Sequence, residues 1–236
     1  MKISVLGTGQ VGRGLAAGLA AGGHEVAVGT RDPVATLARR EPDAQGTPPY
    51  ARWQEEHPDV RLVTLADAGA DAELLVNATS GTASRDALAA AGAGERDGLV
   101  VLDVGNPLRF TEQGIELAVA NTDSLAETLQ RAFPAARVVK ALNTVNSAVM
   151  VDPDRVPGRH AMFVAGDDAA AKETVTGLLG ELGWAGRVLD LGGLRAARGM
   201  EMYVVLWWYA ARAVGTFDLN VTVEHAATAR PPASRT

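Results

Sequence analysis

Three glycines near the start of the chain have the spacing of a loop that binds a dinucleotide. Gly7, Gly9 and Gly12 form a GxGxxG pattern between a short apolar run and a stretch of small residues. In such loops the first glycine permits a tight turn, the second lets the backbone approach a pyrophosphate, and the third allows a helix to pack closely on a strand. The start of that helix offers free N–H groups to the phosphates. A glycine-rich turn without a ligand is the alternative, and the position between strand and helix favours a bound dinucleotide.

The residues beyond the second expected strand distinguish NADP from NAD. NAD-binding proteins place an Asp or Glu there, about 20 residues after the glycines, to bind the ribose hydroxyls. Here the chain reads Gly29-Thr30-Arg31. A guanidinium and a hydroxyl suit the 2′-phosphate of NADP, which a carboxylate would repel. We therefore expect NADP(H) as the cofactor, with the alternative that Arg31 is a solvated loop charge and Asp32 binds the ribose.

Polar and aromatic residues later in the chain are candidates for holding the reacting rings. Asn143 and Thr144 follow the sixth expected strand and could bond a ring carbonyl or a carboxamide, or simply form a turn. Lys140, in the strand itself, is expected to reach water along the sheet surface, with a contact to the cofactor or to an acceptor phosphate as the alternative. Trp207 and Trp208 are expected in core or dimer packing, with stacking on an acceptor ring as the alternative. A bound nicotinamide cofactor carries its own reactivity, so neither a catalytic residue nor a metal is expected.

An α/β sheet is the predicted scaffold for these residues. Short apolar runs alternate with Ala-rich helical stretches, a rhythm typical of parallel strands joined by crossover helices. The sequence predicts strands at residues 2–6, 25–28, 60–65, 74–77, 100–104 and 138–142. Ligands of open α/β sheets bind at the carboxyl ends of the strands, where these runs end in turn-forming residues. The predicted fold class is a Rossmann-type, doubly wound, mostly parallel α/β sheet.

The last third of the chain is predicted to add a smaller α/β unit. The Pro-containing stretch VDPDRVPG sets a boundary near residue 150. Beyond it we expect strands at 161–165 and 187–191 and helices at 168–182 and 194–214. The predicted organisation is an NADP-binding domain over 1–150 and a C-terminal unit over 151–236 that completes the acceptor pocket and a dimer interface. The polar segment 41–58 interrupts the rhythm as a loop or short helix.

Composition argues against several classes of protein. The 236 residues carry a formal charge of −6 with a pI near 5.3, which disfavours nucleic-acid binding. The chain has no cysteine, which excludes disulfides and thiolate chemistry. Its most apolar late segment, 202–214, is too short to span a membrane and contains Arg212. Because the first residues lack the pattern of a signal peptide, a cytoplasmic protein without a membrane partner is expected.

Four segments together resemble the NADPH-dependent coenzyme F420 reductase family. They are GTGQVGRGLAAGLAAGGHEVAVGTRDP, VGNP, VVKALNTVNSAVM and GMEMYVVLWWYAARAVGT. The resemblance covers most of the chain and implies hydride transfer between NADPH and a deazaflavin. Related domains of ferric reductases pass electrons from NADPH to a flavin. Members of the family also tend to self-associate, which implies a homodimer.

The resemblance also implies roles for residues in four loops. The family's pyrophosphate loop is matched by Thr8, Gly9, Gln10 and Val11, and its Ser/Thr-Arg pair for the 2′-phosphate by Thr30 and Arg31. The loop that passes the nicotinamide ribose is matched by Asn77, Ala78, Thr79 and Ser80. The KAxNT segment beside the two rings is matched by Ala141, Leu142, Asn143 and Thr144.

The sequence departs from the family pattern in two places. Thr36 and Leu37 stand where members often carry a lysine, with Arg39 and Arg40 as substitutes, and segment 41–58 looks longer. The identity of the acceptor is therefore open. Besides coenzyme F420 or a flavin, the alternatives are a small carbonyl or imine substrate and a non-catalytic sensor that binds NADP.

Overall fold

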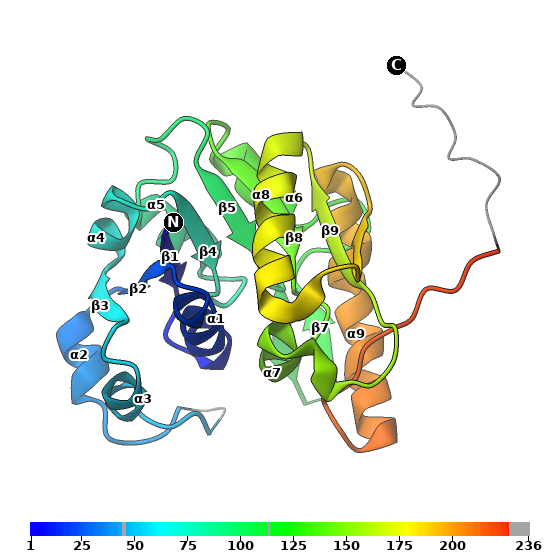
Figure 1. The fold of residues 1–236 in the computed structure, drawn as a ribbon, viewed down its shortest axis with the longest axis horizontal. Helices are drawn as coiled ribbons and strands as arrows, with labels where there is room; N and C mark the ends of the chain where they lie inside the picture. The colour runs from blue at the N-terminus through cyan, green and yellow to red at the C-terminus, as the bar shows by residue number, and fades with distance from the viewer. Residues whose placement is uncertain (44–45, 113, 227–236) are drawn as a thin grey trace.

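An eight-stranded sheet forms the centre of the molecule (Figure 1). The computed structural model describes residues 1–43, 46–112 and 114–226. The strand order is β10-β9-β8-β5-β4-β1-β2-β3, and every neighbouring pair is parallel except β8 with β9. The strands are β1 (Lys2–Leu6), β2 (Glu25–Thr30), β3 (Arg61–Thr64), β4 (Leu74–Asn77), β5 (Val100–Asp103), β8 (Arg137–Ala141), β9 (Met162–Gly166) and β10 (Val188–Asp190).

Helices cover both faces of this sheet, which explains why its central strands are almost continuously apolar. One face packs against α1 (Gln10–Ala21), α7 (Ser147–Val151) and α8 (Ala169–Leu179). The other packs against α4 (Leu65–Ala70), α5 (Ser84–Ala90), α6 (Leu125–Ala132) and the start of α9 (Ala197–Val214). Two further helices, α2 (Pro33–Ala38) and α3 (Tyr50–Glu56), lie beyond the end of β2.

The predicted Rossmann-type α/β class is confirmed, and most element boundaries agree within two residues. The expected strands at 2–6 and 74–77 are β1 and β4 as observed. The third strand is shorter than expected, because Thr64 ends it by capping α4: its hydroxyl accepts a hydrogen bond from the Asp67 N–H. Segment 41–58 contains the short helix α3.

The residues after 150 extend the same sheet. Strand β9 runs antiparallel to β8, and β10 follows helix α8 and pairs in parallel with β9. The expected helix at 168–182 is α8 followed by a helical turn over residues 180–184, and the expected helix at 194–214 begins as a 3₁₀ turn before α9. The sequence patterns did not indicate the antiparallel direction of β9.

A hairpin between β5 and α6 was not predicted. Its strands are β6 (Leu108–Thr111) and β7 (Gly114–Leu117), and it packs against α9 through an edge-to-face contact between Phe110 and Trp208. Within the described part of the chain, no helix combines the length and the apolar character needed to cross a membrane.

Candidate functional site

The glycine-rich loop after β1 has a shape that only glycine permits at two positions. Gly7 has a φ of +125°, and a Cβ there would lie 2.5 Å from the carbonyl oxygen of Ala78. A Cβ on Gly12 would collide with the Gly7 carbonyl oxygen. Gly9, at the start of α1, has open space where its Cβ would point. A phosphate can therefore approach the backbone at Gly9 and the free N–H groups that begin α1.

A cavity of about 560 Å³ opens beside this loop at the carboxyl edge of the sheet. One wall is the loop itself and the other is the face of α5. Its lining residues are Gly7, Thr8, Gly9, Gly29, Thr30, Arg31, Leu65, Ala78, Thr79, Ser80, Ala83, Asp86, Ala87 and Ala90. The cavity lies where the order of strands reverses, between β1 and β4, which is where dinucleotides bind in this class of sheet.

Arg31 and Asp32 have different roles at the end of β2. Asp32 caps α2, where its Oδ1 accepts a hydrogen bond from the Ala35 N–H at 2.9 Å. It does not line the cavity, whereas Arg31 does. Among the described residues, Arg31 has no hydrogen-bond or ion-pair partner, so its guanidinium is available to an anion. Thr30 lies beside it, with its hydroxyl 3.0 Å from that of Thr36.

Segment 41–58 contributes a small side cavity next to the glycine loop. This cavity of about 50 Å³ is lined by Thr8, Gly9, Arg13, Thr36, Arg39, Asp43, Thr47, Pro48, Pro49 and Tyr50. Arg13 holds the two segments together, because its guanidinium donates to the carbonyls of Thr8 at 2.8 Å and Pro48 at 2.7 Å and lies over the Tyr50 ring. Burial raises the pKa of Tyr50, although the Arg13 charge lowers it. The segment therefore supports the glycine loop from outside.

A second cavity, of about 290 Å³, meets the first at the loop after β4. Ala78, Thr79 and Ser80 line both cavities, and we call this shared stretch the waist. Beyond the waist the walls are largely apolar. They comprise Val11, Gly81, Val104, Gly105, Asn106, Leu108, Phe110, Asn143, Val145, Asn146, Ser147, Met150, Val204 and Trp207.

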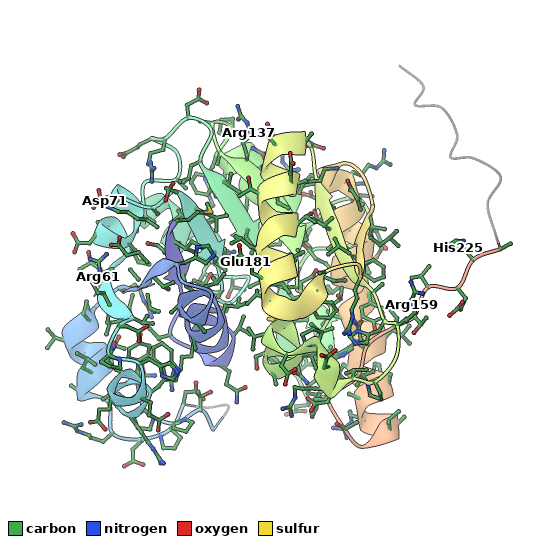
Figure 2. All side chains as sticks on the ribbon, in the orientation of Figure 1. Arg61, Asp71, Arg137, Arg159, Glu181 and His225 are labelled. Carbon is green, nitrogen blue, oxygen red and sulfur yellow. The ribbon has the colours of Figure 1, made fainter. Side chains whose placement is uncertain are left out.

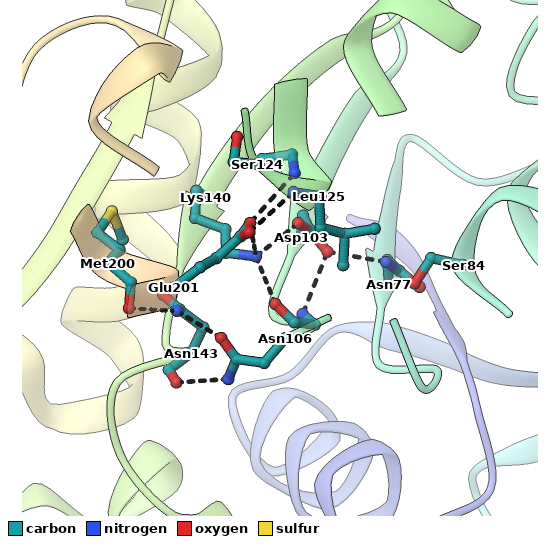
Figure 3. Close-up of polar contacts among 12 residues, drawn as sticks. Asn77, Ser84, Asp103, Asn106, Ser124, Leu125, Lys140, Asn143, Met200 and Glu201 are labelled. Atoms are coloured by element: carbon teal, nitrogen blue, oxygen red, sulfur yellow. Dashed lines mark hydrogen bonds and ion pairs between the residues drawn. The ribbon is translucent and has the colours of Figure 1, made fainter. Parts of the chain in front are cut away.

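A buried charge cluster lies next to the waist (Figure 3). The register of three neighbouring strands aligns Asn77 with Asp103 and Asp103 with Lys140. The Lys140 ammonium donates to Asp103 Oδ2 at 2.8 Å and to the Gly105 carbonyl, and pairs with Glu201 Oε1 at 2.9 Å. Burial alone would lower the pKa of Lys140, but Asp103 and Glu201 raise it, so the amine stays charged. The expectation that Lys140 reaches water is therefore wrong, because its side chain is 0% exposed.

The side-chain amide of Asn143 has a fixed orientation at the edge of the second cavity. Its Nδ2 donates to Asn106 Oδ1 at 2.9 Å and to the Met200 carbonyl at 3.1 Å. Because a main-chain carbonyl only accepts, the nitrogen must face Met200. Asn143 Oδ1 is buried and has no partner among the described residues. Asn143 therefore offers an acceptor, which suits an N–H donor and not the ring carbonyl that its position also allowed.

The cavities separate the predicted site residues into two groups. Those that line a cavity are Gly7, Thr8, Gly9, Val11, Thr30, Arg31, Ala78, Thr79, Ser80 and Asn143. Those that line neither are Gln10, Gly12, Asn77, Ala141 and Thr144. Two of these lie behind the cavity lining. Gly12 packs against the Gly7 carbonyl, and Asn77 donates a hydrogen bond to Asp103. Ala141 and Thr144 are buried, and the Thr144 hydroxyl has no partner within the described residues.

Several lining residues were not predicted from the sequence. Asp86 and Leu65 belong to helices α5 and α4, whose contribution depends on how they pack. Phe110 lies on the unpredicted hairpin, and Val204 comes from α9, which the fold brings to the far side of the second cavity. Trp207 does line this cavity, so the alternative considered for one of the two tryptophans has a geometric basis. No group of three His, Asp or Glu side chains in the described ranges could hold a metal ion.

Comparison with known proteins places the chain in a family. Residues 2–107 match the family described as NADP oxidoreductase, coenzyme F420-dependent. A crystal structure from Arthrobacter sp. FB24, of a protein described as a candidate F420-dependent NADP-reductase, is 50% identical, covers 95% of this chain and 100% of that one, and superposes with a TM-score of 0.90.

Two more distant relatives share part of their length with this chain. The metalloreductase STEAP3 of Rattus norvegicus is 32% identical over 203 residues, which are 85% of this chain but only 36% of that protein. A reductive aminase from Aspergillus terreus, in complex with NADPH and ethyl-5-oxohexanoate, is 18% identical with a TM-score of 0.59, covering 91% of this chain and 63% of that one. The latter similarity shows the fold alone. The comparisons show that the chain is an NADP(H)-binding oxidoreductase and that it belongs to the family of coenzyme F420-dependent NADP oxidoreductases.

Proposed function

We propose that the protein transfers hydride between NADPH and a ring acceptor of the deazaflavin or flavin type, with coenzyme F420 as the leading candidate. The observation that carries this proposal is the pair of cavities that meet at Ala78, Thr79 and Ser80. A dinucleotide whose phosphates lie at the glycine loop would place its nicotinamide near the waist, and an acceptor in the second cavity would face it. The protein then supplies orientation and exclusion of water.

The first cavity fits NADP(H) in shape and charge. The backbone of the glycine loop leaves no room for side chains at Gly7 and Gly12, and Arg31 and Thr30 lie where the 2′-phosphate is expected. Asp32, the carboxylate that could have bound a ribose hydroxyl instead, is engaged in capping α2. When bound, NADPH supplies the hydride as two electrons and a hydrogen nucleus from its nicotinamide ring.

The second cavity fits a flat, largely apolar ring with a polar edge. Trp207, Val204 and Met150 give it apolar walls, and Asn143 Oδ1 is a buried acceptor without a partner in the described structure. That oxygen can accept a hydrogen bond from a ring N–H of the acceptor or from the nicotinamide carboxamide. The acceptor takes the hydride together with one proton from solvent, so that one NADPH and one proton reduce it by two electrons. No side chain needs to form a covalent bond in this transfer.

The experiment is a comparison of NADPH and NADH oxidation with coenzyme F420, FMN and FAD, in wild type, Arg31→Ala and Arg52→Ala. Loss of a charge-assisted contact to the 2′-phosphate should raise the KM for NADPH in Arg31→Ala by about 10-fold or more, because such bonds contribute roughly 1.5–3 kcal/mol. The kinetics with NADH should hardly change. Arg52 is the matched control, since it is an exposed arginine on α3 that lines none of the three cavities described.

Two outcomes would contradict the proposal. If Arg31→Ala raised the KM for NADPH and the KM for NADH by the same factor, Arg31 would not be a ligand of the 2′-phosphate. Tight NADPH binding by wild type without oxidation by any of the three acceptors would remove the deazaflavin and flavin assignment, and would favour a small carbonyl or imine substrate or a sensor role.

A further inference from the structure

Lys140 is a buried cation that the proposed hydride transfer does not use directly. It is 0% exposed, as is Asp103, and Glu201 is 1% exposed. All three ammonium hydrogens have acceptors, because Asp103 Oδ2, Glu201 Oε1 and the Gly105 carbonyl surround the nitrogen. Burying two carboxylates and one ammonium is costly, and well-packed apolar residues would often be at least as stable. A function in specifying local geometry would account for such a cluster.

One branch of the cluster runs from Lys140 through Asp103 to Asn77 (Figure 3) and continues to the waist. Asp103 Oδ1 accepts a hydrogen bond from Asn77 Nδ2 at 2.8 Å, which fixes the orientation of that amide because a carboxylate only accepts. Asn77 Oδ1 then accepts from the Thr79 hydroxyl at 2.7 Å. Thr79 lines both cavities. Three successive side-chain contacts therefore connect the ammonium to the place where the two rings would meet.

The other branch leads to the loop after β5. The Gly105 carbonyl accepts from Lys140, while the Gly105 N–H donates to Asp103 Oδ1 at 3.1 Å. Both main-chain polar groups of Gly105 are thus held by the cluster. Gly105 and the next residue, Asn106, line the second cavity, and Asn106 in turn bonds the amide of Asn143. The cluster therefore holds two adjoining loops, one after β4 and one after β5, that line the second cavity.

We propose that Lys140 is a positioning residue for hydride transfer, acting through Asp103 on Asn77 and Thr79 and through the Gly105 carbonyl on the acceptor wall. This inference rests on the proposed function in one respect, since it takes the nicotinamide to lie at the waist. The adenosine and 2′-phosphate end of NADPH would bind in the first cavity, away from Lys140. Loss of the ammonium should therefore disturb the reacting ring much more than it weakens the binding of NADPH.

The test compares Lys140→Met with Lys172→Met. Lys172 is the matched control because its ammonium also contacts an aspartate, Asp190 at 2.8 Å, and a glycine carbonyl, Gly192 at 3.2 Å, but on α8 and away from both cavities. Three quantities are measured: kcat with the best acceptor, the Kd for NADPH, and the fluorescence anisotropy of the bound nicotinamide. For Lys140→Met we expect kcat to fall by about 10-fold or more, as misplacement of reacting groups does. We expect the Kd to change by less than about threefold and the anisotropy to fall, since the adenosine end carries most of the affinity.

A second variant covers the case in which Lys140→Met does not fold. Lys140→Met combined with Glu201→Gln keeps the formal charge of the cluster at −1, and the new amide nitrogen can occupy the space that the ammonium leaves. The double variant should fold and still show the low kcat with near-normal NADPH affinity. Unchanged kcat and anisotropy in either folded variant would overturn the proposal, and so would a loss of NADPH affinity that parallels the loss of kcat. If none of the three acceptors supports NADPH oxidation by wild type, the proposed function fails. The role of Lys140 is then decided by the nicotinamide anisotropy alone, measured at the same fraction of bound NADPH in each variant.

Discussion

Glu201 is surrounded by hydrogen-bond donors only. Besides the Lys140 ammonium, its carboxylate accepts from the backbone N–H groups of Leu125 at 2.8 Å and Ala126 at 3.2 Å, at the start of α6. One side chain of α9 thus holds the Lys140 cluster and the first turn of α6 together. Burial raises the pKa of Glu201, while the Lys140 charge lowers it. The carboxylate form matches all of these neighbours, because it has no hydrogen of its own to turn toward them.

We therefore predict that Glu201→Gln destabilises the protein although it is nearly isosteric. The amide must point its N–H₂ at the ammonium or at a backbone N–H, which leaves a buried donor unsatisfied and costs about 1–3 kcal/mol. Urea unfolding followed by circular dichroism measures the change in the free energy of unfolding. Glu127→Gln is the control. Like Glu201, Glu127 is paired with a cation, here Arg198, and accepts a second hydrogen bond, here from Ser124, but its side chain is partly exposed. A Glu201→Gln variant as stable as wild type would show that the carboxylate is not required there.

The sequence predicted which residues reach the carboxyl edge of the sheet, but not what their atoms do there. Asn143 was singled out from its position after a strand, and the structure places it at the second cavity. Its side-chain oxygen is the atom without a partner among the described residues, because the nitrogen donates to the carbonyl of Met200, 57 positions away. The cluster of Asp103, Lys140 and Glu201 was missed for the same reason, since register and the path of α9 are tertiary properties.

At the scale of elements, the segment after α9 returns to the wall of the second cavity. Asn146, which caps α7 and lines that cavity, donates to the Phe217 carbonyl at 2.5 Å and to Asp218 Oδ1 at 2.7 Å. Arg155 pairs with Asp218 Oδ2 at 2.6 Å. The N–H of Ala161 donates to the Val221 carbonyl. Residues 217–221 thus fasten α7, and with it one wall of the cavity, to the end of α9.

We predict that this fastening weakens in acid. Hydrogen bonds from Asn146, followed by those from Arg155, lower the pKa of Asp218. A depressed native pKa gives stability that is present above the unfolded value of about 3.9 and is lost as the pH falls through the lower native value. Hydrogen-exchange protection factors of residues 217–221 and of Ala161 should therefore fall as the pH drops from about 5 to below the unfolded value of about 3.9.

The variant Asp218→Asn should show the same loss at neutral pH. The ion pair is exposed and screened by solvent, so we expect protection to fall only about two- to fivefold. Glu224→Gln, in the same exposed segment, is the control. Protection that is equal in Asp218→Asn and wild type would exclude a role for this carboxylate in holding the segment.

The elements that were predicted and those that were missed differ in the kind of information they need. Strands β1 and β4 are short, mostly apolar runs that end next to turn-forming residues, a local signal that a sequence carries. The direction of β9 depends on its partner β8, and the β6–β7 hairpin depends on packing against α9. Neither depends on a local pattern, which is why both appeared only in the structure.

At the scale of the whole molecule, the topology explains where the two cavities meet. In the order of strands, β2 and β3 lie on one side of β1, and β4 and β5 lie on its other side. The loops after β1 and β4 therefore diverge at the carboxyl edge and leave a crevice between them. Helix α9 closes the far end of the second cavity and lies along one side of the molecule (Figures 1 and 2).

The outer face of α9 leads to a prediction about assembly. Met202, Leu206 and Tyr209 follow one another at helical spacing and are 37%, 65% and 53% exposed, and Val214 is 69% exposed. A stripe of apolar side chains on one helix face, on an acidic chain that should otherwise stay dispersed, is typical of an interface. A second copy of the chain is the partner we propose, since two such stripes can pack on each other about a twofold axis.

Light scattering at micromolar concentration should therefore give the mass of a dimer for wild type and of a monomer for Leu206→Glu, which would bury an unpaired charge in that interface. Leu189→Glu is the control, because Leu189 is an exposed leucine on β10 that lines neither of the two cavities. Since Val204 and Trp207 of the same helix line the second cavity, the monomeric variant should bind the acceptor more weakly while its affinity for NADPH, set in the first cavity, stays the same. A monomeric wild type, or a Leu206→Glu variant that remains a dimer, would remove α9 as the interface and would leave its apolar face without a partner of this kind.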